Sequence, residues 1–177
     1  GAEWHLAEPT PVQELQWRDL EAGGITAMGE ALELVAGVLQ SPPMEERALP
    51  PVLVLISDGQ PTDDFDTGLS QLMRQPWAQK AVRLAIAMGH DADLEVLQQF
   101  IGPEPSGGGK SPRRPLQASN ATTLAQYIQW ASTAVVGAAS MPASRLDDSP
   151  QDAGNIPLPD LPPTLLDPVD DVGPLVW

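Results

Sequence analysis

Two side chains with oxygen atoms, Thr26 and Asp58, are the residues whose types and positions best fit a chemical role. Thr26 follows a glycine pair and precedes an amphipathic stretch, while Asp58 follows an unbroken apolar run, VLVLI, at residues 52–56. A hydroxyl and a carboxylate suit Mg²⁺ or Mn²⁺, and a helix N-terminus beside Thr26 would attract an acidic group from outside. An Asp-Gly pair is also a common turn, so Asp58 and Gly59 have a plain structural interpretation as well.

The apolar run at residues 52–56 predicts the strand that carries Asp58. Prolines precede the run and an Asp-Gly turn follows it, which is typical of a strand buried on both faces. Such strands are central in α/β sheets. Ligands bind these sheets in the crevice beyond the carboxyl ends of the strands, which is where Asp58 stands.

A helix is predicted directly after Thr26, which is in position to be its N-cap. Apolar residues recur there at the spacing of one helix face; they are Met28, Ala31, Leu32, Leu34, Val35, Val38 and Leu39. We expect the helix and the strand to bring Thr26 and Asp58 to the same edge of the sheet.

Predicted strands and helices alternate along the rest of the chain. We expect a strand end at residues 1–6, strands at 82–88 and 116–118, and helices at 67–74, after Asp91 or Asp93, and from an Asn120 cap to about residue 134. Leu124, Tyr127, Ile128 and Ala131 are predicted to face inward from the last helix. The tryptophans at positions 4, 17, 77 and 130 are predicted to fill the core or grooves.

This alternation predicts an α/β fold, a doubly wound and mainly parallel sheet with right-handed crossovers, over residues 1–137. Residues 138–177 are predicted to be a separate acidic tail. They hold eight prolines and seven aspartates against one arginine, a composition typical of disordered or extended segments. Apolar residues recur towards Trp177, so docking on a partner or on the chain's own domain is the other interpretation.

The composition excludes several classes of function. The formal net charge is −15 and only nine residues are Lys or Arg, which argues against nucleic-acid binding because phosphate contacts need cations. No cysteine is present, which excludes a disulfide framework, a thiolate metal site and a cysteine nucleophile. No apolar run approaches the length of about 18 residues that a membrane span needs, and no signal peptide is visible. We expect a cytoplasmic protein that binds no membrane.

Three stretches in this order resemble the von Willebrand factor A (VWA) domain. They are GGITAMGEAL at residues 23–32, VLISDGQPTD at residues 54–63, and A-I-x-x-G-x-[DG]-A-D-x-x-x-L, matched by residues 85–97. The closest resemblance is to bacterial VWA proteins associated with tellurium resistance, which share G-x-T-x-x-G-x-A-L and L-x-[ST]-D-G-x-P-T-D. It covers residues 1–134 and leaves out the tail.

The resemblance implies a doubly wound sheet with a metal-ion-dependent adhesion site (MIDAS) at its rim. It implies that Thr26 supplies the hydroxyl ligand of the second MIDAS loop, and that Asp58 is the third-loop aspartate, often bound to the metal through water. An acidic side chain of a protein partner would complete the coordination of Mg²⁺ or Mn²⁺, with Gly59, Gln60 and Asp63 as partner-binding residues. The implied function is metal-assisted protein binding, without catalysis, in a bacterial stress-response or conflict system.

One part of the family pattern, the first MIDAS loop D-x-S-x-S, has no counterpart in this sequence. It normally follows the family's first strand, which lies beside the strand at residues 52–56. We expect the N-terminal remainder of the domain in a longer product, or another chain, to supply that strand and cover an otherwise open edge. With two of the usual ligand positions, the chain alone is expected to bind Mg²⁺ poorly.

Two other functions stay open. A metal-dependent hydrolase would take its first-loop carboxylates from the missing segment, and an added His-Asp or Cys-His cluster would mark it. His90 follows a predicted strand, but no nucleophile is visible with it, so we interpret it as a surface histidine. A scaffold would bind through the tail and Trp177 instead of the rim.

Three aspartates, at positions 63, 64 and 66, follow Asp58 closely. They would suit a second cation site. The simpler interpretation is an acidic loop that caps the helix near Thr67.

Overall fold

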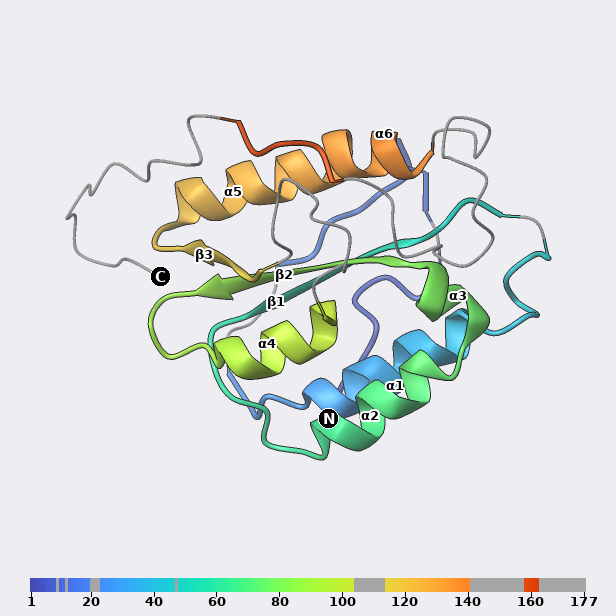
Figure 1. Cartoon of the computed structure of the whole chain (residues 1–177), viewed down its shortest axis with the longest axis horizontal. Helices are drawn as coiled ribbons and strands as arrows, with labels where there is room; N and C mark the ends of the chain where they lie inside the picture. The colour runs from blue at the N-terminus through green and yellow to red at the C-terminus, as the bar shows by residue number, and fades with distance from the viewer. Residues whose placement is uncertain are drawn as a thin grey trace.

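The computed structural model describes residues 1–8, 10–11, 13–19, 23–46, 48–103, 114–140 and 158–162. At its centre is a three-stranded sheet with the order β1-β2-β3, in which both strand pairs are parallel (Figure 1). The strands are β1 (Val52–Ser57), β2 (Val82–Met88) and β3 (Leu116–Ala118). Helices lie on both sides of the sheet, so the predicted α/β fold with a parallel sheet is confirmed.

Four helices contribute to the core on the first face of the sheet. They are α1 (Met28–Val38), α2 (Phe65–Met73), α3 (Pro76–Lys80) and α4 (Leu94–Ile101). Leu72 and Leu97 are fully buried there. The Asp93 side chain accepts hydrogen bonds from the N–H groups of Glu95 and Val96, 3.0 and 3.1 Å away, which confirms it as the cap of α4. Residues 76–80 form a short helix, in which Pro76 at the first helical position needs no N–H partner.

One long helix covers the second face. It comprises α5 (Ala121–Trp130), a π-helical turn η1 (Ala131–Val135) and α6 (Val136–Ala139). The Asn120 side chain accepts a 2.8 Å hydrogen bond from the Thr123 N–H, so the predicted cap is confirmed. The hydroxyls of Ser132 and Thr133 donate to carbonyls one turn earlier, which helps to satisfy the main chain where the helix widens. Ile128 was predicted to face inward, but it is 43% exposed because Tyr127, Trp130 and Ala131 occupy the side of the helix that packs in the core.

Arg83 ties β2 to the ends of two helices. Its guanidinium donates hydrogen bonds to the carbonyl oxygens of Phe100, Ala78 and Ile101, at 2.8, 3.0 and 3.2 Å. Carbonyls in the last turn of a helix have no partner within the helix, so these bonds satisfy the carboxyl ends of α3 and α4. The strand and both helices are thereby fixed relative to one another.

β1 is an edge strand of the described sheet, and the prediction that it is central and buried on both faces is wrong for these residues. It pairs with β2 alone, and Val54 and Ile56 are each 38% exposed. Leu53 and Leu55 pack into the core of the first face. On the other face, α5 packs over β2 and β3, and Val54 and Ile56 are covered only in part. The expected open edge is therefore present among the described residues.

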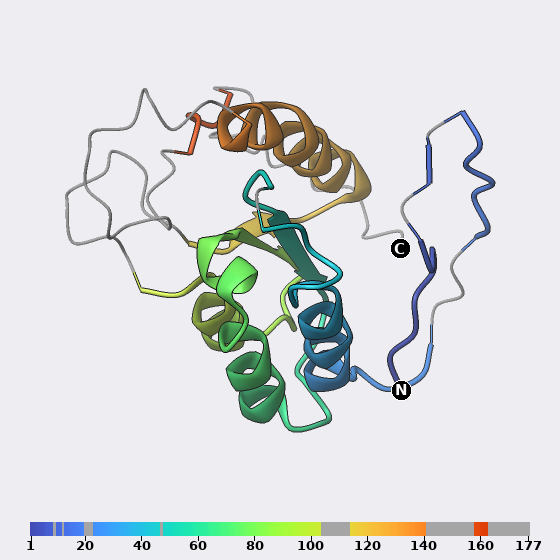
Figure 2. The ribbon, with the colours of Figure 1, turned by 90° about the vertical axis from the view of Figure 1, so that its right-hand side faces the viewer.

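The residues before α1 add no strand to the described sheet. Residues 1–8 are irregular and run apart from the sheet (Figure 2). The strand end expected at residues 1–6 is therefore wrong, because these residues have no neighbouring strand to complete a ladder. Trp17 is 60% exposed, and its ring lies against that of His5, with ring centroids 4.7 Å apart. Trp4 is also exposed, whereas Trp77 and Trp130 are buried as predicted.

The tail is described at residues 158–162 alone, where Leu158 and Leu161 pack against the core of the second face. Trp177 and the other predicted docking residues near it lie outside the described residues. No helix in the described part of the chain is long and apolar enough to cross a membrane.

Candidate functional site

The start of α1 and the loop after β1 meet at the carboxyl end of the sheet. The Thr62 N–H donates a 2.9 Å hydrogen bond to the Thr26 carbonyl. A Cβ placed on Gly59 would lie 3.8 Å from the Thr26 hydroxyl oxygen. The two loops that carry Thr26 and Asp58 are therefore in contact, and we call this region, residues 26 and 58–63, the rim.

Asp63, not Thr26, caps helix α1. The N-cap position belongs to Ala27, which makes no side-chain cap. The two carboxylate oxygens of Asp63 accept hydrogen bonds from the N–H groups of Gly29 and Glu30, at 2.9 and 2.8 Å. The N-cap prediction for Thr26 was therefore wrong, because a carboxylate from the facing loop reaches the helix N-terminus and also complements its dipole. No local sequence signal marks a cap that comes from 34 residues away.

This cap leaves the Thr26 hydroxyl available at the rim. Within the described residues its oxygen takes part in no hydrogen bond, and the side chain is half-buried. Asp63 is committed differently, since both of its oxygens accept from α1. Asp63 therefore has a structural role at the rim, where it lies near Thr26.

The β1 end is held by a small hydrogen-bonded turn. Ser57 is buried, and its hydroxyl donates to the Gly59 carbonyl at 3.2 Å and accepts from the Gly59 N–H at 3.3 Å. Asp58 lies between them and is exposed, as is Gln60. Across the described ranges the Asp58 carboxylate accepts no hydrogen bond and forms no ion pair, so it faces solvent as an unoccupied oxygen donor.

The acidic loop beyond the rim caps the next helix, as its simpler interpretation predicted. The Asp64 carboxylate accepts from the Thr67 hydroxyl at 2.7 Å and from the Thr67 N–H at 3.0 Å. These two hydrogen bonds, the hydroxyl bond first, hold the pKa of Asp64 below its ordinary value of 3.8. Asp66 is exposed in the first turn of α2, where a carboxylate complements the helix dipole.

The donor set of the rim fits a hard divalent cation only in part. Thr26 and Asp58 offer one hydroxyl and one carboxylate, whereas Mg²⁺ takes about six oxygen ligands in near-octahedral geometry. No group of three or more His, Cys, Asp or Glu side chains is gathered anywhere in the part of the chain that the structure describes. The remaining ligands would be waters or groups from outside these residues.

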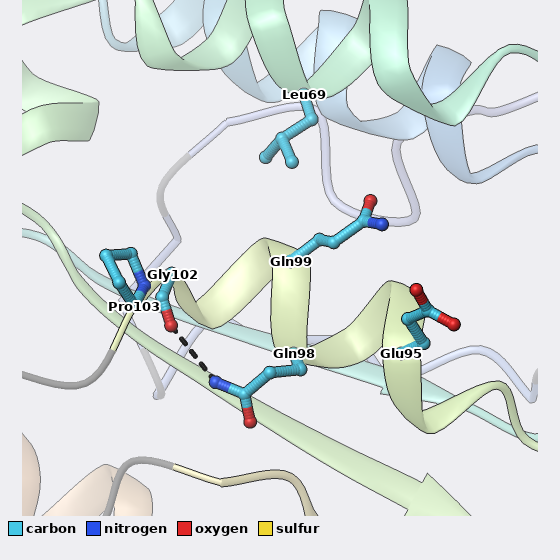
Figure 3. A pocket seen from close by; sticks show the side chains of 6 residues that line it. All are labelled: Leu69, Glu95, Gln98, Gln99, Gly102 and Pro103. Atoms are coloured by element: carbon cyan, nitrogen blue, oxygen red, sulfur yellow. Dashed lines mark hydrogen bonds between the residues drawn. The ribbon is translucent and has the colours of Figure 1, made fainter.

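Other candidate positions lie away from the rim contacts. His90 is exposed in the loop after β2. A cavity of ≈ 660 Å³ lies between α2 and α4 and is lined by Leu69, Glu95, Gln98, Gln99, Gly102 and Pro103 (Figure 3). It contains neither Thr26 nor Asp58, and among the described residues that line it Glu95 is the ionisable one. The cavity and the rim are therefore distinct features.

The structure defines a parallel α/β module with oxygen donors in the loops beyond its carboxyl edge, which is where folds of this class bind ligands. The family model of the von Willebrand factor type A domain matches residues 10–130. Because the match spans more than half of the chain, the protein belongs to the VWA domain family. Comparisons with curated proteins and with solved structures gave no match.

Proposed function

We propose that this VWA domain binds a protein partner through a divalent cation held at the rim, in the manner of a MIDAS. Thr26 would contribute its hydroxyl and Asp58 its carboxylate, the latter directly or through water. An acidic side chain of the partner would complete the coordination, with Gly59 and Gln60 beside it. The bound Mg²⁺ or Mn²⁺ would supply the positive charge that attracts this carboxylate.

The observation that carries the proposal is the contact between the two loops. Thr26 lies against Gly59 and is bonded to Thr62, while Asp58 is exposed on the same loop. The capping of α1 by Asp63 removes the need for a Thr26 cap. A hydroxyl and a carboxylate without partners among the described residues are thus presented together at the carboxyl edge, where α/β folds bind ligands.

The open edge of β1 supports the second part of the proposal, that another segment completes the sheet. The Val82 N–H donates to the Pro51 carbonyl at 2.9 Å. Alternate residues of a parallel strand bond to the same neighbour, so residues 53, 55 and 57 face β2. The main-chain groups of Val54 and Ile56 then point to the open edge, and their apolar side chains are exposed beside it. We propose that the N-terminal remainder of the domain, or another chain, pairs here.

A strand added at this edge would end beside Asp58, because neighbouring parallel strands share their carboxyl edge. Its following loop is the natural source of further oxygen ligands. The proposal therefore includes weak cation binding by these 177 residues alone and tighter binding once that segment is present.

Paramagnetic Mn²⁺ tests the location of the site. Added to the full ¹⁵N-labelled chain, Mn²⁺ should broaden the amide signals of residues 26 and 58–60 first. Thr26→Val and Asp58→Asn should each remove this selectivity, whereas Asp66→Asn, a matched change at an exposed aspartate, should keep it. Broadening that begins at the amide signals of other residues, or broadening that stays selective for the rim in Asp58→Asn, would refute the rim as the site.

Calorimetry tests the completeness of the ligand set. Titration of Mg²⁺ into the chain should show no micromolar binding, because two oxygen donors do not fix an octahedral ion. Micromolar binding would mean that the described chain already holds a full set of ligands, contrary to the proposal.

The biological setting we propose is a bacterial stress-response or conflict system, including tellurium resistance. It rests on the stretches at residues 23–32 and 54–63, which resemble that subgroup. We propose binding without catalysis; a metal-dependent hydrolase, the alternative, would take its first-loop carboxylates from a segment outside these residues.

A further inference from the structure

The loop of the rim, residues 58–63, is joined to the start of α1 at its far end. The Asp63 carboxylate accepts hydrogen bonds from the N–H groups of Gly29 and Glu30, at 2.9 and 2.8 Å. The preceding residue, Thr62, donates its N–H to the Thr26 carbonyl at 2.9 Å. The end of the loop therefore binds the main chain on both sides of the point where α1 begins.

Thr26 lies just outside the helix and depends on that end of α1 for its position. The helix begins at Met28, and its N-cap Ala27 makes no side-chain cap. Ile25, immediately before Thr26, is 66% exposed, so its side chain does not anchor this segment in the core. The first N–H groups of a helix have no partner within the helix, and helix ends fray. Fraying of the first turn would displace Thr26 from the loop that it faces.

Asp58 has an anchor of its own at the opposite end of the loop. The Ser57 hydroxyl bonds to the main chain of Gly59, and Ser57 is buried at the end of β1. The Thr26 hydroxyl lies against this end of the loop, since a Cβ on Gly59 would come within 3.8 Å of its oxygen. The strand thus places Asp58, the helix places Thr26, and the far end of the loop connects the two.

The chemistry of this connection requires a carboxylate. Asp63 presents one oxygen to the Gly29 N–H and the other to the Glu30 N–H. An Asn side chain has a single acceptor oxygen and would leave one of these amides without its partner. The negative charge of Asp63 also complements the positive end of the helix dipole. Substitution by Asn and substitution by Ala should therefore weaken the connection to different extents.

We infer that Asp63 is a positioning residue of the cation site: by capping α1, it holds the Thr26 hydroxyl beside Asp58 so that both donors can bind one ion. This inference rests on the proposed function and adds to it the residue that keeps the two donors together. A site with few ligands depends on their placement before the ion arrives, because the free energy spent on ordering them is lost from binding. Residues that orient metal ligands typically contribute about 10–100-fold to metal affinity.

Titration of Mn²⁺ into the ¹⁵N-labelled full chain tests this role. In the parent chain, the amide signals of residues 26 and 58–60 should broaden over the same range of Mn²⁺ concentration. In Asp63→Ala, with the signals of β2 and α4 unchanged, residues 58–60 should need about tenfold more Mn²⁺, and residue 26 should no longer follow them. Joint broadening of both sets in Asp63→Ala, at the Mn²⁺ concentrations of the parent, would overturn the proposal.

Two further variants separate the position of Thr26 from the charge of Asp63. Asp63→Asn removes the same charge but keeps one acceptor oxygen, so its Mn²⁺ requirement should lie between that of Asp63→Ala and that of the parent. Asp66→Ala removes an exposed carboxylate three residues further along the chain and should leave both sets of signals broadening together. Equal effects of Asp63→Asn and Asp63→Ala would indicate charge alone and overturn the proposal.

Hydrogen exchange tests the same role without metal. The Thr62 amide donates to the Thr26 carbonyl, so its exchange reports whether the loop still holds Thr26. Asp63→Ala should speed this exchange by about tenfold or more and leave unchanged the exchange of the Gly89 amide, which donates to the Ala118 carbonyl at 3.1 Å. If the parent shows rim-selective broadening, unchanged exchange of Thr62 in Asp63→Ala would overturn the role of Asp63 alone. Absence of that broadening in the parent would refute the cation site, and this role with it.

Discussion

Gly29 of α1 and Gly68 of α2 lie in main-chain contact. A Cβ built on Gly68 would come within 2.6 Å of the Gly29 Cα, and a Cβ on Gly29 would meet the Asp64 main chain at 2.8 Å. Both glycines are buried. Only residues without side chains allow the two helices to approach this closely, and the same approach carries Asp63 to the α1 N-terminus.

Gly68→Ala should destabilise the domain by about 1–3 kcal/mol, because the added methyl group meets main chain that cannot rotate away. Chemical denaturation of the variant and the parent chain measures this difference. Gly37→Ala is the matched control, since its Cβ would meet nothing within 4 Å. It should raise stability by up to about 1 kcal/mol through helix propensity. An equal effect of both changes would contradict the close helix contact.

Asp63→Ala should lower stability by about 1–2 kcal/mol, since it removes both acceptors for the α1 N-terminus. The amides of Gly29 and Glu30 should then lose protection in hydrogen exchange. Asp63→Asn keeps one acceptor oxygen, so its stability should lie between that of Asp63→Ala and that of the parent chain. Asp66→Ala, which removes an exposed carboxylate that accepts no hydrogen bond in the described structure, should have a much smaller effect on these amides.

The regular elements were predictable because their signals are local. Apolar spacing located α1 and VRLAIAM located β2. Polar residues at helix starts predicted Asn120 as one cap and either Asp91 or Asp93 as another, and the structure selects Asp93. Asp63 could not be assigned in this way, since it acts on a helix 34 residues earlier. The contact of Gly29 with Gly68 is equally non-local.

The rim was predictable to the extent that it depends on strand order and family motifs. Parallel strands placed Asp58 at the carboxyl edge, and the structure brings Thr26 into contact with that loop. Burial of β1 was predicted wrongly because an apolar run reports which side chains avoid water, not which neighbouring strand covers them. Val54 and Ile56 remain exposed among the described residues for that reason.

Asp64 should contribute a pH-dependent part of the stability. Its pKa in the folded protein is below the ordinary value of 3.8, so the deprotonated form is favoured by folding. This contribution is fully present above pH 3.8 and is lost as the pH falls through the lower, folded-state pKa. In denaturation from pH 7 downwards, the deficit of Asp64→Ala relative to the parent should narrow below about pH 4. A deficit that stays constant or widens in acid would contradict the hydrogen bonds from Thr67 as the cause.

Arg83→Met should destabilise the domain more than any surface charge removal, by about 2–3 kcal/mol. The change leaves the carbonyls of Ala78, Phe100 and Ile101 without their shared donor. Arg83→Lys should recover little of the loss, because one ammonium group cannot reproduce the fixed fork of a guanidinium across the ends of two helices. Hydrogen exchange should show weaker protection in α4 for both variants. Arg74→Met, at an exposed position, should leave α4 protected, and near-native stability of Arg83→Lys would indicate that charge, not geometry, holds these helix ends.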